Sequence, residues 1–216
     1  MTIKKFLHSC ILIENEGRRL LIDPGAFSFI EGKLKPEEIG AVDGILITHS
    51  HADHCYPKAL KKILSLKPAP IIAHQEIIDL LAKEKISAEP IAAGEIREVA
   101  GFSVQAFKAP HEPILTDIPH NLAFFINKTL LHPGDSLSVN PLPSCEILAL
   151  PVASPWARRV DAVTFTQQVN AKTVIPIHDA FLKDFFLKGN DETYGTYFTE
   201  RGIAYHPLAL GESLKI

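Results

Sequence analysis

The sequence lacks several features that would assign it to a specialised class of protein. It has no apolar run of the about 18 residues that a membrane-spanning helix needs, and the apolar stretch before Glu14 is too short for a secretory signal. Its three cysteines, Cys10, Cys55 and Cys145, are too few and too scattered for a disulfide framework, which favours a reducing compartment. We therefore expect a cytoplasmic protein with no membrane insertion.

Charge of one sign is also missing. The 22 basic and 25 acidic side chains leave a formal net charge of −3, so broad neutralisation of nucleic-acid phosphates is not expected. No serine nucleophile elbow, phosphate-binding glycine loop or dinucleotide fingerprint is present. These absences favour a small-molecule substrate as the partner and argue against nucleic acid, while a homo-oligomer stays compatible with the sequence.

Two β-hairpins are expected, and each places an aspartate just beyond the end of its second strand. The hairpins cover residues 11–22 and 122–131, and the aspartates are Asp23 and Asp135. This similarity indicates an internal duplication, and two unrelated hairpins are the alternative.

Helices and strands are predicted to alternate along the rest of the chain. Apolar residues at helical spacing predict the helices, and short apolar runs predict the strands. The predicted helices cover 57–66, 75–83 and 161–169, and the predicted strands cover 44–47, 69–73, 96–99, 102–107, 146–150 and 173–177. This order is typical of two mixed sheets packed face to face with helices outside.

The most specific chemical signal directly follows the predicted buried strand over 44–47. His49, His51, Asp53 and His54 place four potential metal ligands within six positions of a turning loop. Imidazole suits Zn²⁺, Mn²⁺ and Fe²⁺, and a carboxylate makes the site harder and more anionic. The pattern predicts a metal site, and a polar surface loop is the weaker alternative.

Three further residues follow predicted strands in the same way. His111, Asp135 and His178 each lie at the carboxyl end of a strand, where α/β proteins build their sites. Taken singly, each has a structural alternative, as a loop residue, a turn residue or a core histidine. Their shared placement favours a common site with His49.

These residues resemble the signature of the metallo-β-lactamase superfamily. The signature is His49-x-His51-x-Asp53-His54 followed by separated His111, Asp135 and His178, and the resemblance covers essentially the whole chain. Finer features resemble the branch that contains the ascorbate-6-phosphate lactonases and the N-acyl-phosphatidylethanolamine phospholipases D. These features are His8-Ser9, Leu21-Ile22-Asp23-Pro24, His132-x-Gly134-Asp135-Ser136 and Ile175-Pro176-Ile177-His178.

The resemblance implies an α/β fold, a four-layer αββα sandwich of two mixed β-sheets flanked by helices. It implies one domain over residues 1–216, with pseudo-repeated halves of about 1–110 and 111–216. A boundary between separate domains is not expected.

The resemblance also implies two divalent metal ions. It assigns His49, His51 and His111 to the first ion and Asp53, His54 and His178 to the second, with Asp135 bridging them. Zn²⁺ is the expected metal, and Mn²⁺ and Fe²⁺ are the alternatives.

A metal pair of this kind predicts hydrolysis by a metal-bridging hydroxide. The expected substrate is a small carboxylic ester, lactone or phosphodiester, and Asp53 has a second, catalytic role in orienting the water or accepting its proton. A nuclease of the same superfamily and a non-catalytic metal-binding or sensor protein are the alternatives.

Residues outside the ligand set are predicted to support it. Asp23 is expected to orient a metal-bound histidine, although it can also simply close a turn. His8 is expected to face the site, with a structural histidine as the even alternative, and His132 is expected to brace the loop that carries Asp135.

Aromatic residues in loops or elements that follow strands at this edge are candidates for an apolar pocket wall. They lie within residues 26–30, which include Phe27 and Phe29, within residues 181–186, and at Tyr56 and Trp156. The alternative is that they belong to the core. Arg158 and Arg159 are candidates for contact with an anionic substrate, with a solvated helix start as the favoured alternative.

Overall fold

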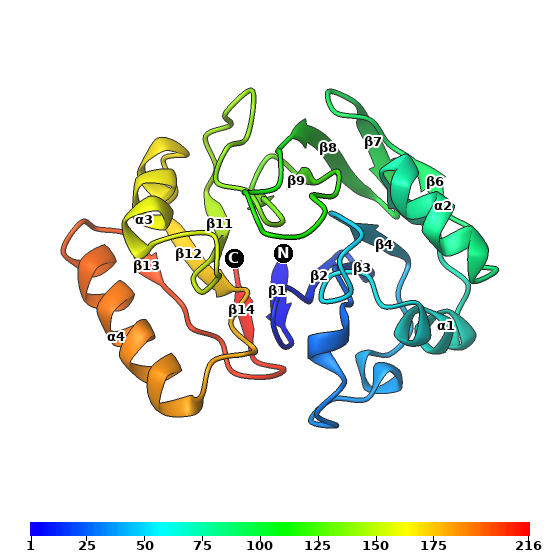
Figure 1. Cartoon of the computed structure of the whole chain (residues 1–216), viewed down its shortest axis with the longest axis horizontal. Helices are drawn as coiled ribbons and strands as arrows, with labels where there is room; N and C mark the ends of the chain where they lie inside the picture. The colour runs from blue at the N-terminus through cyan, green and yellow to red at the C-terminus, as the bar shows by residue number, and fades with distance from the viewer.

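Two seven-stranded sheets lie face to face in the structure, a computed structural model that describes residues 1–216 (Figure 1). In order, the first sheet contains β14 (Ser213–Lys215), β1 (Thr2–Lys5), β2 (Ile11–Asn15), β3 (Arg18–Ile22), β4 (Gly44–Ile47), β5 (Ile71–Ala73) and β6 (Glu89–Pro90). The second contains β13 (Ala204–Tyr205), β12 (Thr173–Ile177), β11 (Ile147–Pro151), β10 (Leu130–His132), β9 (Leu122–Ile126), β8 (Phe102–Lys108) and β7 (Ile96–Val99).

Helices cover the outer face of each sheet (Figure 1). The first sheet carries α1 (Pro57–Leu66) and α2 (Gln75–Lys83), and the second carries α3 (Arg159–Gln168) and α4 (Asp184–Thr199). Two 3₁₀ turns, η1 (Ala26–Ser28) and η2 (Pro36–Ile39), lie between β3 and β4. The predicted αββα sandwich of two mixed sheets is confirmed.

The central strands are apolar on both faces because both faces are covered. In β2, Ile11 and Ile13 pack into the core between the sheets, while Leu12 faces the helices. In β3, Leu20 and Ile22 face inward and Leu21 faces outward. Strand alternation therefore supplies one inter-sheet core and two sheet–helix cores from short apolar segments.

The two sheets are built by the same succession of elements. The order β2-β3-β4-α1-β5-α2-β6 in the first sheet matches β9-β10-β11-α3-β12-α4-β13 in the second. The chain changes sheet between β6 and β7, however, so β7 and β8 lie in the second sheet although they precede residue 110. The boundary predicted near 110 therefore does not coincide with the change of sheet, and the duplication stays a prediction.

Local pattern predicted most elements, and the residues that it missed have identifiable reasons. Helices α1 and α2 have the predicted bounds, and α3 begins two residues before the predicted Asp161. Helix α4 was missed because only Asn190, Tyr194 and Phe198 of its 16 residues are buried, so the segment shows no clear apolar stripe. Strand β14 was missed because it is three residues long and pairs with β1 from the other end of the chain. Strands β1, β6 and β13 were also not predicted, and β6 and β13 are only two residues long. None of the helices combines the length and apolar character needed to cross a membrane.

Candidate metal centre

The predicted ligands meet at one edge of the two sheets because their strands run in matching directions. Strands β3 to β6 are parallel in the first sheet, as are β10 to β13 in the second. Strand β8 has the same direction as β10, because each is antiparallel to β9. The carboxyl ends of β4, β8, β10 and β12 therefore present His49, His111, Asp135 and His178 to one space.

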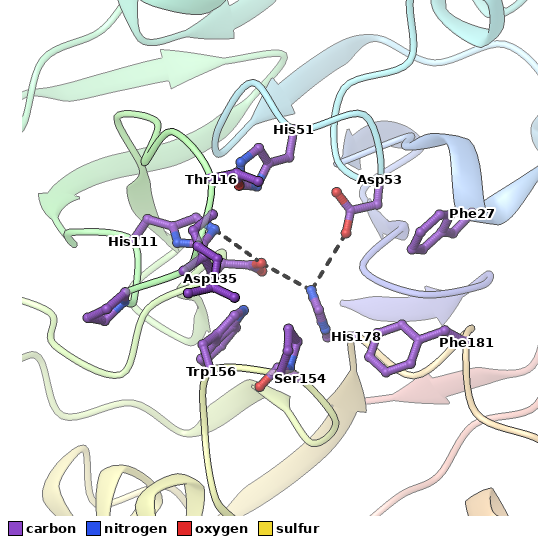
Figure 2. Close-up of a pocket in the computed structure, with 14 residues that line it drawn as sticks. Phe27, His51, Asp53, His111, Thr116, Asp135, Ser154, Trp156, His178 and Phe181 are labelled. Carbon is purple, nitrogen blue, oxygen red and sulfur yellow. Dashed lines mark ion pairs between the residues drawn. The ribbon is translucent and has the colours of Figure 1, made fainter.

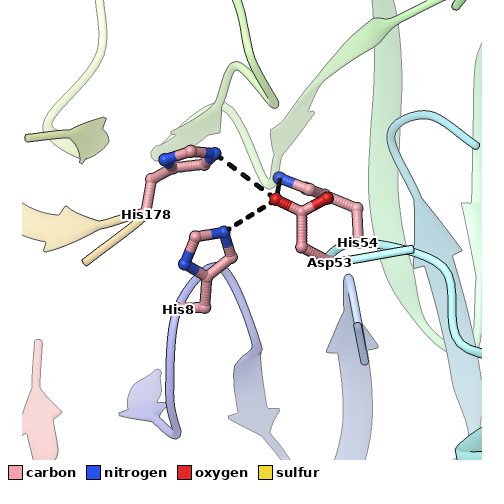
Figure 3. Close-up of side chains that lie close together, drawn as sticks. All are labelled: His8, Asp53, His54 and His178. Atoms are coloured by element: carbon pink, nitrogen blue, oxygen red, sulfur yellow. Dashed lines mark hydrogen bonds and ion pairs between the residues drawn. The ribbon is translucent and has the colours of Figure 1, made fainter. Parts of the chain in front are cut away.

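Two clusters of side chains could each hold a metal ion. Within each cluster the ligand atoms lie within 4.8 Å of one another. The first cluster contains His49, His51, His111 and Asp135, of which Figure 2 shows the last three. The second contains His8, Asp53, His54 and His178 (Figure 3). The structure thus groups the histidines as the resemblance implied and adds His8 to the second set.

Asp135 lies between the two clusters. Its Oδ1 atom is 3.0 Å from His54 Nε2, and its Oδ2 atom is 3.0 Å from His178 Nε2 and 3.5 Å from His111 Nε2 (Figure 2). A carboxylate placed in this way reaches both clusters. This is the placement that a bridging ligand requires.

The histidine nitrogens at the centre fit metal ions because they have no other partner. The Nε2 atoms of His49, His54, His111 and His178 are buried, and apart from the Asp135 carboxylate, 3.0–3.9 Å away, they have no hydrogen-bond partner. Unpaired buried polar atoms are costly, so their convergence needs an explanation. Four imidazole nitrogens around a carboxylate are the donor set of a Zn²⁺, Mn²⁺ or Fe²⁺ site.

The opposite nitrogen of each ring is held by an oxygen. His111 Nδ1 lies 2.6 Å from the carbonyl oxygen of Glu112, and His178 Nδ1 lies 2.6 Å from that of Ala153. A carbonyl oxygen can only accept, so the proton of each neutral ring is on Nδ1 and the lone pair on Nε2. This is how proteins orient metal-bound histidines.

Asp23 supports a histidine of each cluster. Its Oδ2 accepts a hydrogen bond from His54 Nδ1 at 2.7 Å and another from the Thr48 hydroxyl at 2.7 Å. The Thr48 hydroxyl oxygen in turn lies 3.0 Å from His49 Nδ1, and Asp23 Oδ1 accepts from the Thr48 amide at 2.8 Å. One buried carboxylate thus connects to His54 directly and to His49 through Thr48.

His8 differs from the other histidines of the second cluster. Its Nδ1 faces the amide N–H of Ala180 at 3.4 Å, so the ring proton is on Nε2, which lies 3.1 Å from Asp53 Oδ2 (Figure 3). Burial lowers the pKa of His8 to about 4, against the opposing effect of its hydrogen bond to Asp53. A neutral His8 therefore donates to Asp53, which makes it a partner of a ligand and not itself a free ligand.

The electrostatic balance keeps both acids ionised. Burial acts to raise the pKa of Asp53, but the hydrogen bond that it accepts from His8 holds it below its usual range. Burial likewise acts to raise the pKa of Asp135, and His54 and His178 hold it well below its usual value. Two ionised carboxylates at one centre, the buried Asp135 and the partly exposed Asp53, favour bound cations.

Backbone geometry and a buried ion pair fix the loops that carry these groups. His8, Asp23 and His178 all have left-handed backbone conformations, with φ of 60°, 48° and 64°. Such conformations are costly for residues other than glycine and concentrate at functional sites. Lys5 forms a buried ion pair with Asp179, which ties β1 to the loop after β12.

A cavity of about 950 Å³ opens onto the centre (Figure 2). Of the aromatic candidates, Phe27, Trp156 and Phe181 line it, whereas Phe29 and Tyr56 pack in the core between the first sheet and its helices. Asp53 and the candidate ligands His51, His111, Asp135 and His178 complete this part of the wall. The sequence did not identify the other lining residues, which are Pro113, Ile114, Leu115, Thr116, Ser154 and Pro155. They lie in irregular loops, where no periodicity predicts orientation.

Two other predicted groups lie away from the cavity. His132 is fully buried, and its Nε2 donates to the carbonyl oxygen of Ser9 at 3.2 Å, so it braces the turn before Asp135 and does not line the pocket. Arg158 pairs with Asp161, and Arg159 donates to Asn190. The alternative of an arginine that meets substrate is therefore not supported.

Comparisons with known proteins agree with this geometry. A sequence profile described as the Beta-lactamase superfamily domain matches residues 2–178. Protein Rv0786c of Mycobacterium tuberculosis is 33% identical over 196 residues, covering 84% of this chain and 85% of its own. A UPF0173 metal-dependent hydrolase of Carboxydothermus hydrogenoformans is 27% identical over 189 residues, covering 79% and 81%. A solved metallo hydrolase of the archaeon Ignicoccus hospitalis superposes with a TM-score of 0.76 at 19% identity, covering 100% of both chains. The chain belongs to the metallo-β-lactamase superfamily.

Proposed function

We propose that this chain is a binuclear metal-dependent hydrolase that acts on a small carboxylic ester or lactone. The observation that carries the proposal is the set of buried, unpaired histidine Nε2 atoms that converge on Asp135 beneath an open cavity. A structural metal site is closed by protein ligands, whereas a catalytic one is open to water and substrate. The names of the similar metal-dependent and metallo hydrolases support the same reaction class.

Two divalent cations at this centre would supply Lewis acidity and a water that ionises near neutral pH. We propose Zn²⁺ as the metal, with Mn²⁺ and Fe²⁺ as alternatives that the same donors suit. His49, His51 and His111 would hold one cation, Asp53, His54 and His178 the other, and Asp135 would contact both.

Asp53 is the residue that we assign to proton transfer. Unlike the buried Asp135, it is partly exposed, and it lines the cavity (Figure 2). The ionised carboxylate can orient an attacking water through a hydrogen bond and accept its proton. The N–H of His8, which is fully buried and does not line the cavity, holds the carboxylate in place.

The choice of an ester or lactone as the electrophile follows the resemblance to the lactonase-containing branch, while the superfamily match alone supports only the broader class of metal-dependent hydrolases. Thr116 and Ser154 give the cavity uncharged hydroxyl groups that can position a carbonyl compound.

The test combines metal analysis with a substrate panel. Purified protein, chelated protein and protein reconstituted with Zn²⁺, Mn²⁺ or Fe²⁺ would be assayed on lactones, carboxylic esters, thioesters, phosphodiesters and β-lactams. We expect about two metal ions per chain, hydrolysis of an ester or lactone, and loss of that activity on chelation. Asp53→Asn that keeps both ions should lose most activity. Fully metallated protein that hydrolyses nothing in the panel would overturn the proposal.

A further inference from the structure

The walls of the cavity have a chemical character that the metal centre does not explain. The only charged or titratable side chains among its lining residues are His51, Asp53, His111, Asp135 and His178, all of which belong to the two clusters. No lysine or arginine lines the cavity. The rest of the wall is apolar or carries a neutral hydroxyl group.

The apolar side chains surround the space above the centre. Phe27 and Phe181 lie on one side of the cavity and Trp156 lies on the other (Figure 2). Trp156 is close to the centre, since its ring centroid is 5.7 Å from that of His178 and 6.2 Å from that of His111. A group attached to the reacting carbonyl would therefore contact aromatic surface.

The loop between β8 and β9 adds an aliphatic rim. Ile114 and Leu115 line the cavity, and Leu115 is fully exposed to solvent. A large apolar side chain with no protein partner gains free energy when a ligand covers it. The rim is thus suited to cover the apolar part of a bound substrate.

From this wall we infer that the substrate carries an uncharged, apolar group next to its scissile carbonyl, and that substrates with an anionic tail are rejected. An anionic group held inside the cavity against the half-buried Ile114 and Trp156 would lose water without gaining a cationic partner. A phosphorylated ester or lactone is therefore a poor substrate, even though the branch that the sequence resembles contains the ascorbate-6-phosphate lactonases. The inference rests on the proposed hydrolase function and specifies its substrate class.

The test uses 4-nitrophenyl esters that differ only in the acyl tail. The acetate, butyrate and hexanoate form a neutral series, and the mono-adipate replaces the terminal methyl group of the hexanoate with a carboxylate. We expect kcat/KM to rise about two- to fourfold per methylene group along the neutral series. We expect kcat/KM for the mono-adipate to be at least about tenfold lower than kcat/KM for the hexanoate, because the carboxylate is desolvated without a partner.

One substitution should change this preference. Leu115→Arg places a cation at the rim without disturbing the core, and it should raise kcat/KM for the mono-adipate while lowering it for the hexanoate. Ile96→Arg is the matched control, since Ile96 on β7 is also exposed and does not line the cavity. It should leave both values unchanged.

A binding measurement separates this inference from the hydrolase function. Trp156 is the only tryptophan of the chain, so intrinsic tryptophan fluorescence reports on the cavity alone. Titration of chelated protein, followed by this fluorescence, should give a dissociation constant for hexanamide at least about tenfold lower than that for adipamate, its carboxylated analogue. Removing metal prevents the carboxylate from binding as a metal ligand.

The outcomes are distinct. If no ester is hydrolysed but hexanamide is preferred in the titration, the hydrolase function fails and the apolar pocket stands. If esters are hydrolysed with the mono-adipate preferred, the inference is overturned while the hydrolase function stands. If neither amide changes the fluorescence, or adipamate binds more tightly, the inference is likewise overturned.

Discussion

Replacing Asp23 with asparagine should weaken metal binding although Asp23 touches no metal. The carboxylate is fully buried and accepts three hydrogen bonds, from the Thr48 amide, the Thr48 hydroxyl and His54 Nδ1, at 2.8, 2.7 and 2.7 Å. Asparagine offers one acceptor oxygen and one NH₂ group. If the oxygen stays with the Thr48 amide, the NH₂ group faces His54 and favours the ring form that is protonated on Nε2, the nitrogen needed for metal.

The magnitude follows from the lost charge-assisted hydrogen bond. Such a bond contributes about 1.5–3 kcal/mol, which corresponds to a loss of about 10- to 150-fold in metal affinity. Substitutions of residues that orient metal ligands typically cost about 10- to 100-fold, so the two figures agree. The melting temperature of the metal-free protein should also fall, by about 3–12 °C.

The assay is competition with a chelator of known affinity, together with thermal unfolding of the metal-free protein. Asp43→Asn is the matched control, because Asp43 also accepts a backbone hydrogen bond in the first sheet, from Arg19 at 2.8 Å, but lies outside both clusters. The control should lower stability without changing metal affinity. Two metal ions bound by Asp23→Asn with the affinity of the wild type would refute the reasoning, as would an equal loss of affinity in Asp43→Asn.

Three further predictions test neighbouring features. Gly25→Ala should fold poorly or lose metal, because a Cβ atom at residue 25 would lie 1.6 Å from the carbonyl oxygen of Asp53. A variant with the metal content and melting temperature of the wild type would contradict this prediction. His8→Phe should retain both metal ions, because His8 is not a free ligand, yet lower kcat more than it raises KM by removing the donor to Asp53; loss of one ion per chain would instead identify His8 as a ligand. Burial raises the pKa of Asp191, so the folded protein binds a proton there more readily than the unfolded chain, and this group's contribution to stability falls as the pH rises. Asp191→Asn keeps an acceptor for the Tyr205 hydroxyl, so its melting temperature should exceed that of the wild type at pH 7. This difference should disappear near pH 4. An equal difference at both pH values would contradict the stated pH dependence of the stability.

Local periodicity predicted the fold class and most of the elements because hairpins and amphipathic helices record their environment in a few consecutive residues. The helix over 57–66 is an example, since its apolar stripe directly reflects the face that packs on the first sheet. The pattern failed for α4, whose burial depends on three residues, and for β14, whose partner β1 is about the whole chain length away.

For the candidate site too, local features were predictable from the sequence and contacts between distant residues were not. The ligand types and their position after strands are visible in the sequence, and the parallel order of the strands is enough to bring them together. The role of Thr48 was not predicted, although it precedes His49 directly, because only its contact with Asp23 gives its hydroxyl a function. The tautomer of His8 likewise depends on Ala180, which is distant in sequence.

The amino-acid sequence by itself determined which donor atoms are available and that they follow strand ends, since both properties are local. Only the tertiary structure decided which imidazole nitrogens remain without partners, which carboxylate orients them, and that no lysine or arginine reaches the cavity. The physical reason is that hydrogen-bond partners and cavity walls come from loops far apart along the chain, and folding alone sets their distances and burial.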